Sequence, residues 1–338
     1  MTVLTNCLSE TPDEGCLRVA NSLVSRIKKA FDGVTVISYE RKSCLTDVFV
    51  RSNKFLLTRE MIAAVRKCDD DILYIPFPAR SSATALRILI LSFFARKKVR
   101  VLLSQVTEIS FAAKIFLLLC NAEFFVISED TKQKMEKTVN KKRIRKICLG
   151  IDTEKFIPVS DEKATELKKK YGIPCDKPVV LHVGHLNEGR NISQLIKLAD
   201  RFFVLLVTST LTKNEQDEEL RKKLLSCPAV RLIDDYIPDI EEIYQLSDVY
   251  FFPVVEEGRC IDVPLSCLEA ASCNKPIVTT DFGEMKSFNG KNGFHFIDSF
   301  NADVINRLVS EAVNCKNPGS RLAVLDYDWN AAIKNFID

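Results

Sequence analysis

The sequence has no long apolar run and no export signal. Its longest apolar stretch, residues 85–95, is interrupted by Arg87 and followed by Arg96, Lys97 and Lys98. It is far shorter than the roughly 20 residues of a membrane span. The first residues lack the positive and apolar regions of a signal peptide. We therefore expect a cytoplasmic protein, and a mean hydropathy near zero excludes a polytopic membrane protein.

Cysteines and histidines lack the spacing of a metal or redox site. The 12 cysteines include no Cys-x-x-Cys pair, which favours reduced thiols in a cytosolic protein. The three histidines, His182, His185 and His295, all lie in the second half of the chain. His182 falls within an apolar run and is expected in the core. His185 follows that run and is a candidate for ligand contact.

Short apolar runs alternate with longer amphipathic stretches. The apolar runs predict strands at residues 34–39, 72–77, 99–104, 124–128, 144–149, 179–183, 203–208, 230–233, 249–252 and 277–280. The amphipathic stretches predict helices at residues 17–31, 59–68, 83–95, 109–119, 131–139, 161–171, 192–202, 215–225, 239–246, 264–272 and 302–314. This alternation is typical of parallel sheets covered on both faces. We predict an α/β protein with two Rossmann-like, doubly wound domains facing each other across a cleft.

The 338 residues suffice for two such domains. The boundary between them falls near residues 150–177, a stretch that contains Pro158 and the Gly172-Ile173-Pro174 turn. We place the first domain at residues 1–155 and the second at residues 156–320. Residues 321–338 are expected to form a C-terminal helix that packs back towards the first domain.

Two strand–loop–helix segments carry the polar residues expected of a ligand-binding site. In residues 251–271, a buried strand is followed by a loop with three carboxylates, and a helix then starts near Pro264. Glu269 lies in this otherwise apolar helix, and a buried carboxylate needs a polar partner. In residues 183–191, Gly184 allows close backbone approach and Arg190 could hold a phosphate. Each segment alone is also compatible with a capped helix and solvated side chains.

Taken in order, five segments resemble the family-4 retaining glycosyltransferases of GT-B fold, the glycosyl transferases group 1. The matching strings are Gly150-Ile151-Asp152 to Phe156-Ile157-Pro158, Val183-Gly184-His185-Leu186 to Arg190-Asn191, Ile243-Tyr244 to Asp248-Val249, Leu268-Glu269-Ala270-Ala271 to Lys275-Pro276, and Asn292-Gly293. The resemblance is dense from about residue 149 to residue 336 and looser before it.

The resemblance implies a hexosyltransferase-like enzyme that transfers sugar from a nucleotide-diphosphate sugar with retention. Arg190 matches the basic residue that contacts the diphosphate, and Glu269 matches the carboxylate that holds the ribose. The backbone N–H groups of Leu265 and Ser266 would neutralise the departing diphosphate, so that no metal or other cofactor is required. Gly15, in the loop after the first strand, would let the backbone approach the donor.

The sequence departs from the family pattern at two places. Position 261, eight residues before Glu269, is Ile, so the Glu-x7-Glu motif is broken, and Glu257 or Asp262 would have to supply the first carboxylate. His185 replaces the usual Arg and offers one donor without a full charge. These changes leave open the alternative that the chain is a non-catalytic GT-B protein that acts as a partner or regulatory subunit of another transferase. A third reading is another GT-B enzyme, such as a nucleotide-sugar epimerase.

Charge is unevenly divided along the chain. Residues 1–150 carry 26 Lys and Arg against 15 Asp and Glu, a net charge of +11, whereas the remainder carries −8. Such asymmetry suggests that the first half faces an anion. Because basic clusters at 96–100 and 141–146 flank apolar stretches, we expect a lipid-linked or carbohydrate acceptor and peripheral attachment to an anionic membrane surface. A solvated basic face is the alternative. No nucleic-acid-binding module is visible.

Overall fold

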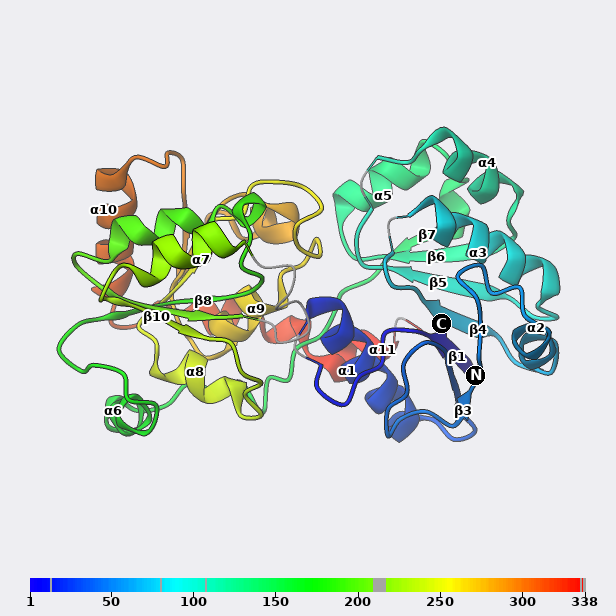
Figure 1. Ribbon diagram of the computed structural model, residues 1–338, viewed down its shortest axis with the longest axis horizontal. Helices are drawn as coiled ribbons and strands as arrows, with labels where there is room; N and C mark the ends of the chain where they lie inside the picture. Colours follow the sequence, from blue (N-terminus) through cyan, green and yellow to red (C-terminus); the bar gives the residue numbers. More distant parts are fainter. Residues whose placement is uncertain (13, 80, 107, 209–216, 335, 337–338) are drawn as a thin grey trace. The chain divides into compact units, whose positions relative to one another are not determined.

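The chain forms two compact units, each built on one sheet (Figure 1). The computed structural model describes residues 1–338 except 13, 80, 107, 209–216, 335 and 337–338. The first unit comprises Met1–Leu149 with Ile261–Val263 and Ala332–Asp338, and the second comprises Gly150–Cys260 with Pro264–Ala331. The chain thus divides at Gly150, where we predicted residue 155. Of the predicted C-terminal segment, residues 321–331 belong to the second unit and the rest to the first.

The first unit contains a seven-stranded parallel sheet in the order β3-β2-β1-β4-β5-β6-β7. Its strands are β1 (Thr2–Thr5), β2 (Thr35–Ser38), β3 (Val48–Phe49), β4 (Ile72–Ile75), β5 (Val99–Leu103), β6 (Ala122–Val126) and β7 (Ile144–Lys146). Its helices are α1 (Gly15–Ala30), α2 (Arg59–Arg66), α3 (Ser82–Phe94), α4 (Phe111–Leu119) and α5 (Glu129–Glu136).

Helices α2, α3, α4 and α5 pack on the same face of this sheet. Their buried side chains, including Met61, Ile88, Leu117 and Met135, belong to one core cluster with residues of the strands. Helix α3 lies beside α4, as Figure 1 shows. Helix α1 links β1 to β2 in the opposite direction along the sheet, so that a right-handed crossover places it on the other face.

The second unit contains a six-stranded parallel sheet in the order β10-β9-β8-β11-β12-β13. Its strands are β8 (Val179–Val183), β9 (Phe203–Val207), β10 (Val230–Ile233), β11 (Val249–Phe252), β12 (Ile277–Thr279) and β13 (Phe294–Phe296). Its helices are α6 (Asp161–Lys170), α7 (Glu218–Leu225), α8 (Ile240–Leu246), α9 (Leu265–Ser272) and α10 (Ala302–Val313), and α11 (Trp329–Lys334) begins in it.

The prediction of two Rossmann-like α/β domains is confirmed. All five residues of β9 are buried, and all four of β4 and of β11 are buried as well. Continuous burial of this kind arises because helices cover both faces of a parallel sheet. Apolar runs without alternation were therefore the correct signal for these strands.

The structure differs from the predicted elements in a few places. Strands β1, β3 and β13, of two to four residues each, were not among the predicted strands. The predicted helix at 192–202 is a 3-10 helix over Ile192–Leu198, whose bonds reach three residues back, as from Gln194 N–H to the Asn191 carbonyl. The predicted helix at 215–225 starts in residues 215–216, which lie outside the described residues, and α7 begins at Glu218.

Candidate active site

The six-stranded sheet has a topological switch point between β8 and β11. The chain runs from β8 to β9 and β10 on one side, and then returns to form β11 on the other side of β8. In open α/β sheets, ligands bind at the carboxyl ends of the strands at such a point. The loop after β8 carries Gly184 and Arg190, and the loop after β11 leads to α9. The two segments singled out from the sequence therefore meet at one place in this unit.

Arg190 is a buried cation without a carboxylate partner among the described residues. Only 6% of the residue is exposed. Its side-chain Nε donates a hydrogen bond of 3.0 Å to the Arg259 carbonyl, and its backbone N–H donates one of 3.1 Å to Oδ1 of Asn187. The nearby carboxylate of Glu256 is paired with Arg259 at 2.8 Å. A desolvated guanidinium that pairs with no carboxylate is suited to bind an anion.

Two glycines make room for these side chains. A Cβ atom at position 184 would collide with Nη1 of Arg190. A Cβ at position 189 would likewise collide with the Arg259 side chain and lie 2.5 Å from Oε2 of Glu256. Neither glycine has a positive φ, so packing rather than backbone conformation requires them. The structure shows that the Arg190 side chain lies against Gly184, whereas the predicted close approach of a ligand to this backbone stays a prediction.

His182 lies in β8, directly below this loop, and is fully buried as predicted. Its Nδ1 lies 2.8 Å from the Phe251 carbonyl oxygen, so Nδ1 carries the proton and Nε2 remains an acceptor. In the part of the chain that the structure describes, Nε2 has no hydrogen-bond partner. Burial, together with the charge of Arg190, lowers the pKa of His182 to about 4. The imidazole is therefore neutral near pH 7.

The first turn of α9 presents free backbone donors. Pro264 precedes the helix and supplies no side-chain cap. Within the described residues, the N–H groups of Leu265 and Ser266 donate no hydrogen bond, whereas those of Cys267 and Leu268 donate to the Pro264 carbonyl. Unpaired N–H groups and the positive end of the helix dipole favour an anion at this position.

Glu269, one turn further along α9, is held by a tyrosine. Its Oε2 accepts a hydrogen bond of 2.8 Å from the Tyr244 hydroxyl, and only 3% of the residue is exposed. Tyr244 comes from α8 and packs edge-on against Phe156. The Tyr244 hydroxyl thus supplies a hydrogen bond of the kind that a buried carboxylate requires. Sequence reasoning missed this role, although Tyr244 stood within one of the matching strings.

The two candidates for the first carboxylate fall in different units. Glu257 is exposed in the loop between β11 and α9, in the second unit. Asp262 belongs to the first unit, where its carboxylate accepts hydrogen bonds from the hydroxyls of Ser128 and Thr131 at the start of α5. Burial raises the pKa of the Asp262 carboxyl above its ordinary value, while the two hydroxyls lower it. The predicted catalytic roles of both residues stay predictions.

Gly15 lies at the start of a helix, and His185 lies in the loop after β8. Gly15 is the first residue of α1, and a Cβ there would meet Ile261 at 3.5 Å, an ordinary contact. Its φ is not positive, so the fold itself does not require glycine at this position. His185 is half-buried just after Gly184, and its carbonyl accepts a hydrogen bond from Asn187.

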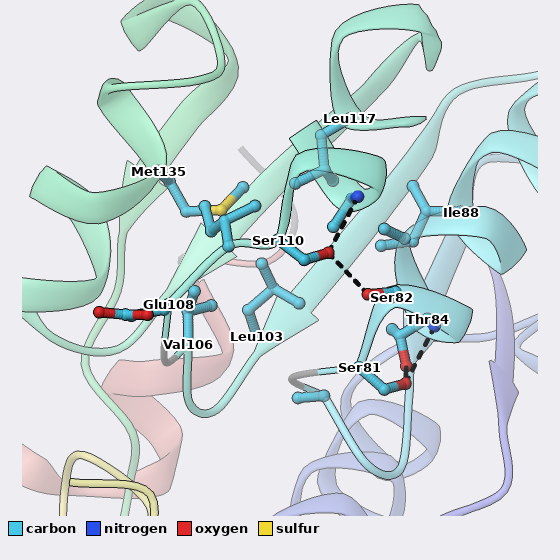
Figure 2. A pocket seen from close by; sticks show the side chains of 14 residues that line it. Ser81, Ser82, Thr84, Ile88, Leu103, Val106, Glu108, Ser110, Leu117 and Met135 are labelled. Carbon is cyan, nitrogen blue, oxygen red and sulfur yellow. Dashed lines mark hydrogen bonds between the residues drawn. The ribbon is translucent and has the colours of Figure 1, made fainter. Parts of the chain in front are cut away.

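The first unit contains a pocket of about 60 Å³ beneath α3 and α4. Its interior is apolar, and Ile88, Leu117 and Met135 reach into it from three helices (Figure 2). The hydroxyls of Ser82 and Ser110 lie at its rim, 2.7 Å apart, where α3 and α4 begin. Sequence reasoning did not identify this pocket, because its lining comes from four separate segments.

The described ranges hold neither a metal-ligating cluster nor a membrane-spanning helix. No group of three or more His, Cys, Asp or Glu side chains there has the arrangement of a metal site. In the same residues, no helix combines the length and the apolar character that crossing a bilayer requires.

Comparison with known proteins connects the second unit to a family. Residues 163–324 match the family model described as Glycosyl transferases group 1. The chain is 27% identical over 208 residues to D-inositol 3-phosphate glycosyltransferase of Corynebacterium urealyticum, covering 56% of this chain and 46% of the relative. It is 26% identical over 138 residues to alpha-galactosylglucosyldiacylglycerol synthase of Streptococcus pneumoniae, covering 39% and 36%. The chain thus covers less than half the length of these curated relatives.

The fold as a whole is similar to that of solved GT-B proteins. HepE of Anabaena, crystallised with UDP and glucose, superposes with a TM-score of 0.77 at 13% identity, over 99% of this chain and 97% of HepE. At this identity the likeness establishes the fold alone. Together with the family match, it confirms the predicted GT-B architecture. Residues 163–324 of this chain thus match the glycosyl transferases group 1 family within a chain of GT-B fold.

Proposed function

We propose that the chain is a family-4 retaining glycosyltransferase that needs no metal ion and uses a nucleotide-diphosphate sugar as donor. The observation that carries this proposal is Arg190, a buried guanidinium that no described carboxylate neutralises at the switch point of the six-stranded sheet. A diphosphate supplies the missing negative charge, and the donor's phosphate oxygens accept from the guanidinium.

We assign the remaining donor contacts to the same loops, to α9 and, in the first unit, to Gly15. The free N–H groups of Leu265 and Ser266 stabilise the negative charge that grows on the diphosphate as it leaves. Gly184 and Gly15 let backbone approach the donor, and His185 donates one hydrogen bond. Glu269, which Tyr244 orients, accepts from the ribose hydroxyls.

In the transfer step, the bond between the anomeric carbon and the diphosphate oxygen breaks, and the acceptor oxygen bonds to the same face of that carbon. The acceptor proton passes to the departing phosphate. The fixed dipoles of α9 and the charge of Arg190 supply the stabilisation that a metal ion gives in other transferases. Glu257 or Asp262 provides the first carboxylate of the site.

We further propose a lipid-linked or carbohydrate acceptor in glycolipid or surface-polysaccharide assembly. The name of one curated relative, a diacylglycerol glycolipid synthase, supports the lipid acceptor. The excess of basic residues in the first 150 residues supports an anionic acceptor or surface. The protein would then work in the cytoplasm, peripherally on the membrane.

Thermal unfolding tests the donor assignment. Purified protein is heated with UDP-, GDP-, ADP- and CMP-sugars in the presence of EDTA, beside the Glu269→Gln variant. A ligand at 100 times its Kd adds about 2.7 kcal/mol to the free energy of unfolding. We expect one nucleotide class to stabilise the wild type despite EDTA, and the variant to lose the effect. No stabilisation by any nucleotide sugar would contradict the proposal.

Product analysis with the purified protein tests the proposed sugar transfer. The product formed on a glycolipid acceptor is analysed for the configuration at the anomeric carbon, which we expect to match that of the donor. Glu257→Gln and Asp262→Asn identify which carboxylate the reaction needs. Donor binding without any transfer would favour a non-catalytic partner or regulatory subunit instead.

A further inference from the structure

Helix α4 presents an apolar face to solvent. Phe111 is 80% exposed, Ile115 40%, Leu118 62% and Leu119 68%. Phe111, Ile115 and Leu118 recur at i, i+4 and i+7, so they share one side of the helix. Only Ala113 and Leu117 of this helix are buried. A surface helix of a soluble domain normally turns polar residues outward, so this face lacks the polar residues that water would favour.

The end of helix α3 extends this face. The Ser82 hydroxyl, in the first residue of α3, is hydrogen-bonded to Ser110, the residue that caps α4. The two helices therefore start together and run side by side, which brings their last turns to the same end of the surface. Phe93, in the last turn of α3, is 79% exposed. We name Phe93, Phe111, Ile115, Leu118 and Leu119 the α4 face.

Free cations flank the α4 face. Lys114 lies on α4 itself, and Arg96 and Lys97 directly follow α3. All three are exposed, and none forms an ion pair within the described residues. The basic cluster predicted at 96–100 is thus only partly available, because Lys98 and Arg100 pair with Glu123 at 3.0 and 3.5 Å.

We propose that the α4 face docks this protein onto an anionic lipid bilayer. The aromatic and aliphatic side chains enter the interface between headgroups and acyl chains, while Arg96, Lys97 and Lys114 contact lipid phosphates. A second copy of the chain is a poorer occupant. Pairing of two identical surfaces would bring the same three cations of each copy together without a counter-charge.

The location of the surface suits the proposed reaction, on which this inference rests. Phe111 directly follows Ser110, whose hydroxyl lies at the rim of the apolar pocket. Ser82 at the same rim and the start of both helices lie at the carboxyl edge of the seven-stranded sheet. A lipid-linked acceptor held in the bilayer would thus reach the rim of this pocket without leaving the membrane surface.

Vesicle flotation tests the surface. The full chain is mixed with phosphatidylcholine vesicles with and without phosphatidylglycerol, beside the double variant Phe111→Ser, Leu118→Ser. The control is Leu322→Ser, because Leu322 is as exposed as Phe111, at 77%, but lies in the second unit. We expect the wild type and the control to float with anionic vesicles. The double variant should bind roughly tenfold more weakly or worse.

Charge variants separate the two contributions. Arg96→Gln and Lys97→Gln should each weaken binding to the anionic vesicles by roughly fivefold and leave binding to pure phosphatidylcholine unchanged. An equal loss of vesicle binding in the double variant and in Leu322→Ser would overturn the proposal. So would a wild-type dimer that Phe111→Ser dissociates while the protein stays at the bottom of the gradient.

Donor binding distinguishes failure of the surface from failure of the proposed function. The nucleotide-sugar thermal shift should be the same in the wild type and the double variant, because neither residue lies in the six-stranded unit. If flotation depends on the α4 face but no sugar is transferred to any acceptor, the docking surface is supported and the proposed transfer reaction is refuted. Transfer to a vesicle-borne acceptor that the double variant leaves unchanged would refute the surface alone.

Discussion

The guanidinium of Arg190 occupies the space that a side chain at Gly184 would need. A Cβ at position 184 would collide with Nη1 of Arg190 and would lie 3.1 Å from Nε2 of His182. The glycine after β8 thus fixes where the buried cation lies in the second unit.

Gly184→Ala should therefore displace Arg190. We expect the free energy of unfolding to fall by about 1–3 kcal/mol, the usual cost of overpacking. The affinity for the nucleotide sugar should fall at least roughly tenfold, because charge-assisted hydrogen bonds are lost. Chemical denaturation and isothermal titration measure the two effects. Gly15→Ala is the control for folding, since its Cβ makes only an ordinary contact, and equal unfolding energies for both variants would contradict the argument.

Arg190→Gln should separate stability from binding. Because no described carboxylate pairs with Arg190, its removal leaves no buried anion behind, and we expect the unfolding free energy to change by no more than about 1 kcal/mol. Donor affinity should fall roughly 100-fold, as measured by titration. Arg221→Gln, which breaks an ion pair with Asp234, should change neither quantity much. An undiminished donor affinity in Arg190→Gln would remove the basis of the proposed donor site.

Tyr244→Phe should destabilise the protein, because it removes the hydroxyl that donates a hydrogen bond to the Glu269 carboxylate. We expect a loss of about 2 kcal/mol in unfolding free energy, because the hydroxyl donates to a buried carboxylate. Tyr250→Phe is the matched control, since its buried hydroxyl is hydrogen-bonded only to neutral groups in the described residues, the backbone of Val183 and the Ser266 side chain, and a loss of about 1 kcal/mol is expected. Denaturant titration of both variants gives the comparison, and a larger cost for Tyr250→Phe would count against it.

His182 should make the protein less stable in mild acid. Burial lowers its pKa to about 4 in the folded chain, against 6.5 for an ordinary histidine. Between these values the unfolded chain binds more protons, so stability falls as the pH falls from 6.5 towards 4, by about 3 kcal/mol in total.

Unfolding by denaturant at several pH values between 7 and 4 measures this slope. His182→Gln should flatten it, whereas His295→Gln should change it less, because His295 is only half-buried and its pKa is lowered less strongly. An unchanged slope in His182→Gln would mean that other groups cause the acid sensitivity.

Much of the architecture could be predicted from the sequence because the signal is local. A strand buried on both faces must be apolar at every position, as in β9, and the helices between such strands must be amphipathic. Strand β3 was not predicted, because it has only two residues, both exposed, and so carries no apolar pattern. The helix at 192–198 was found, but its 3-10 geometry depends on hydrogen bonding that the pattern does not record.

The sequence by itself determined the two α/β units and the residues at the ends of β8 and β11, because a strand–loop–helix signal occupies neighbouring positions of the chain. Only the tertiary structure decided which of these residues have partners. Arg259 and Arg190 both lie in polar loops, yet Glu256 pairs with the first and no described carboxylate with the second. Likewise, Asp262 joined the first unit, through Ser128 and Thr131. The Glu256–Arg259 pair is local, since the two residues are three positions apart. The contacts of Arg190 with the Arg259 carbonyl and of Asp262 with Ser128 join residues far apart in the chain, and these depend on which segments meet in the folded unit.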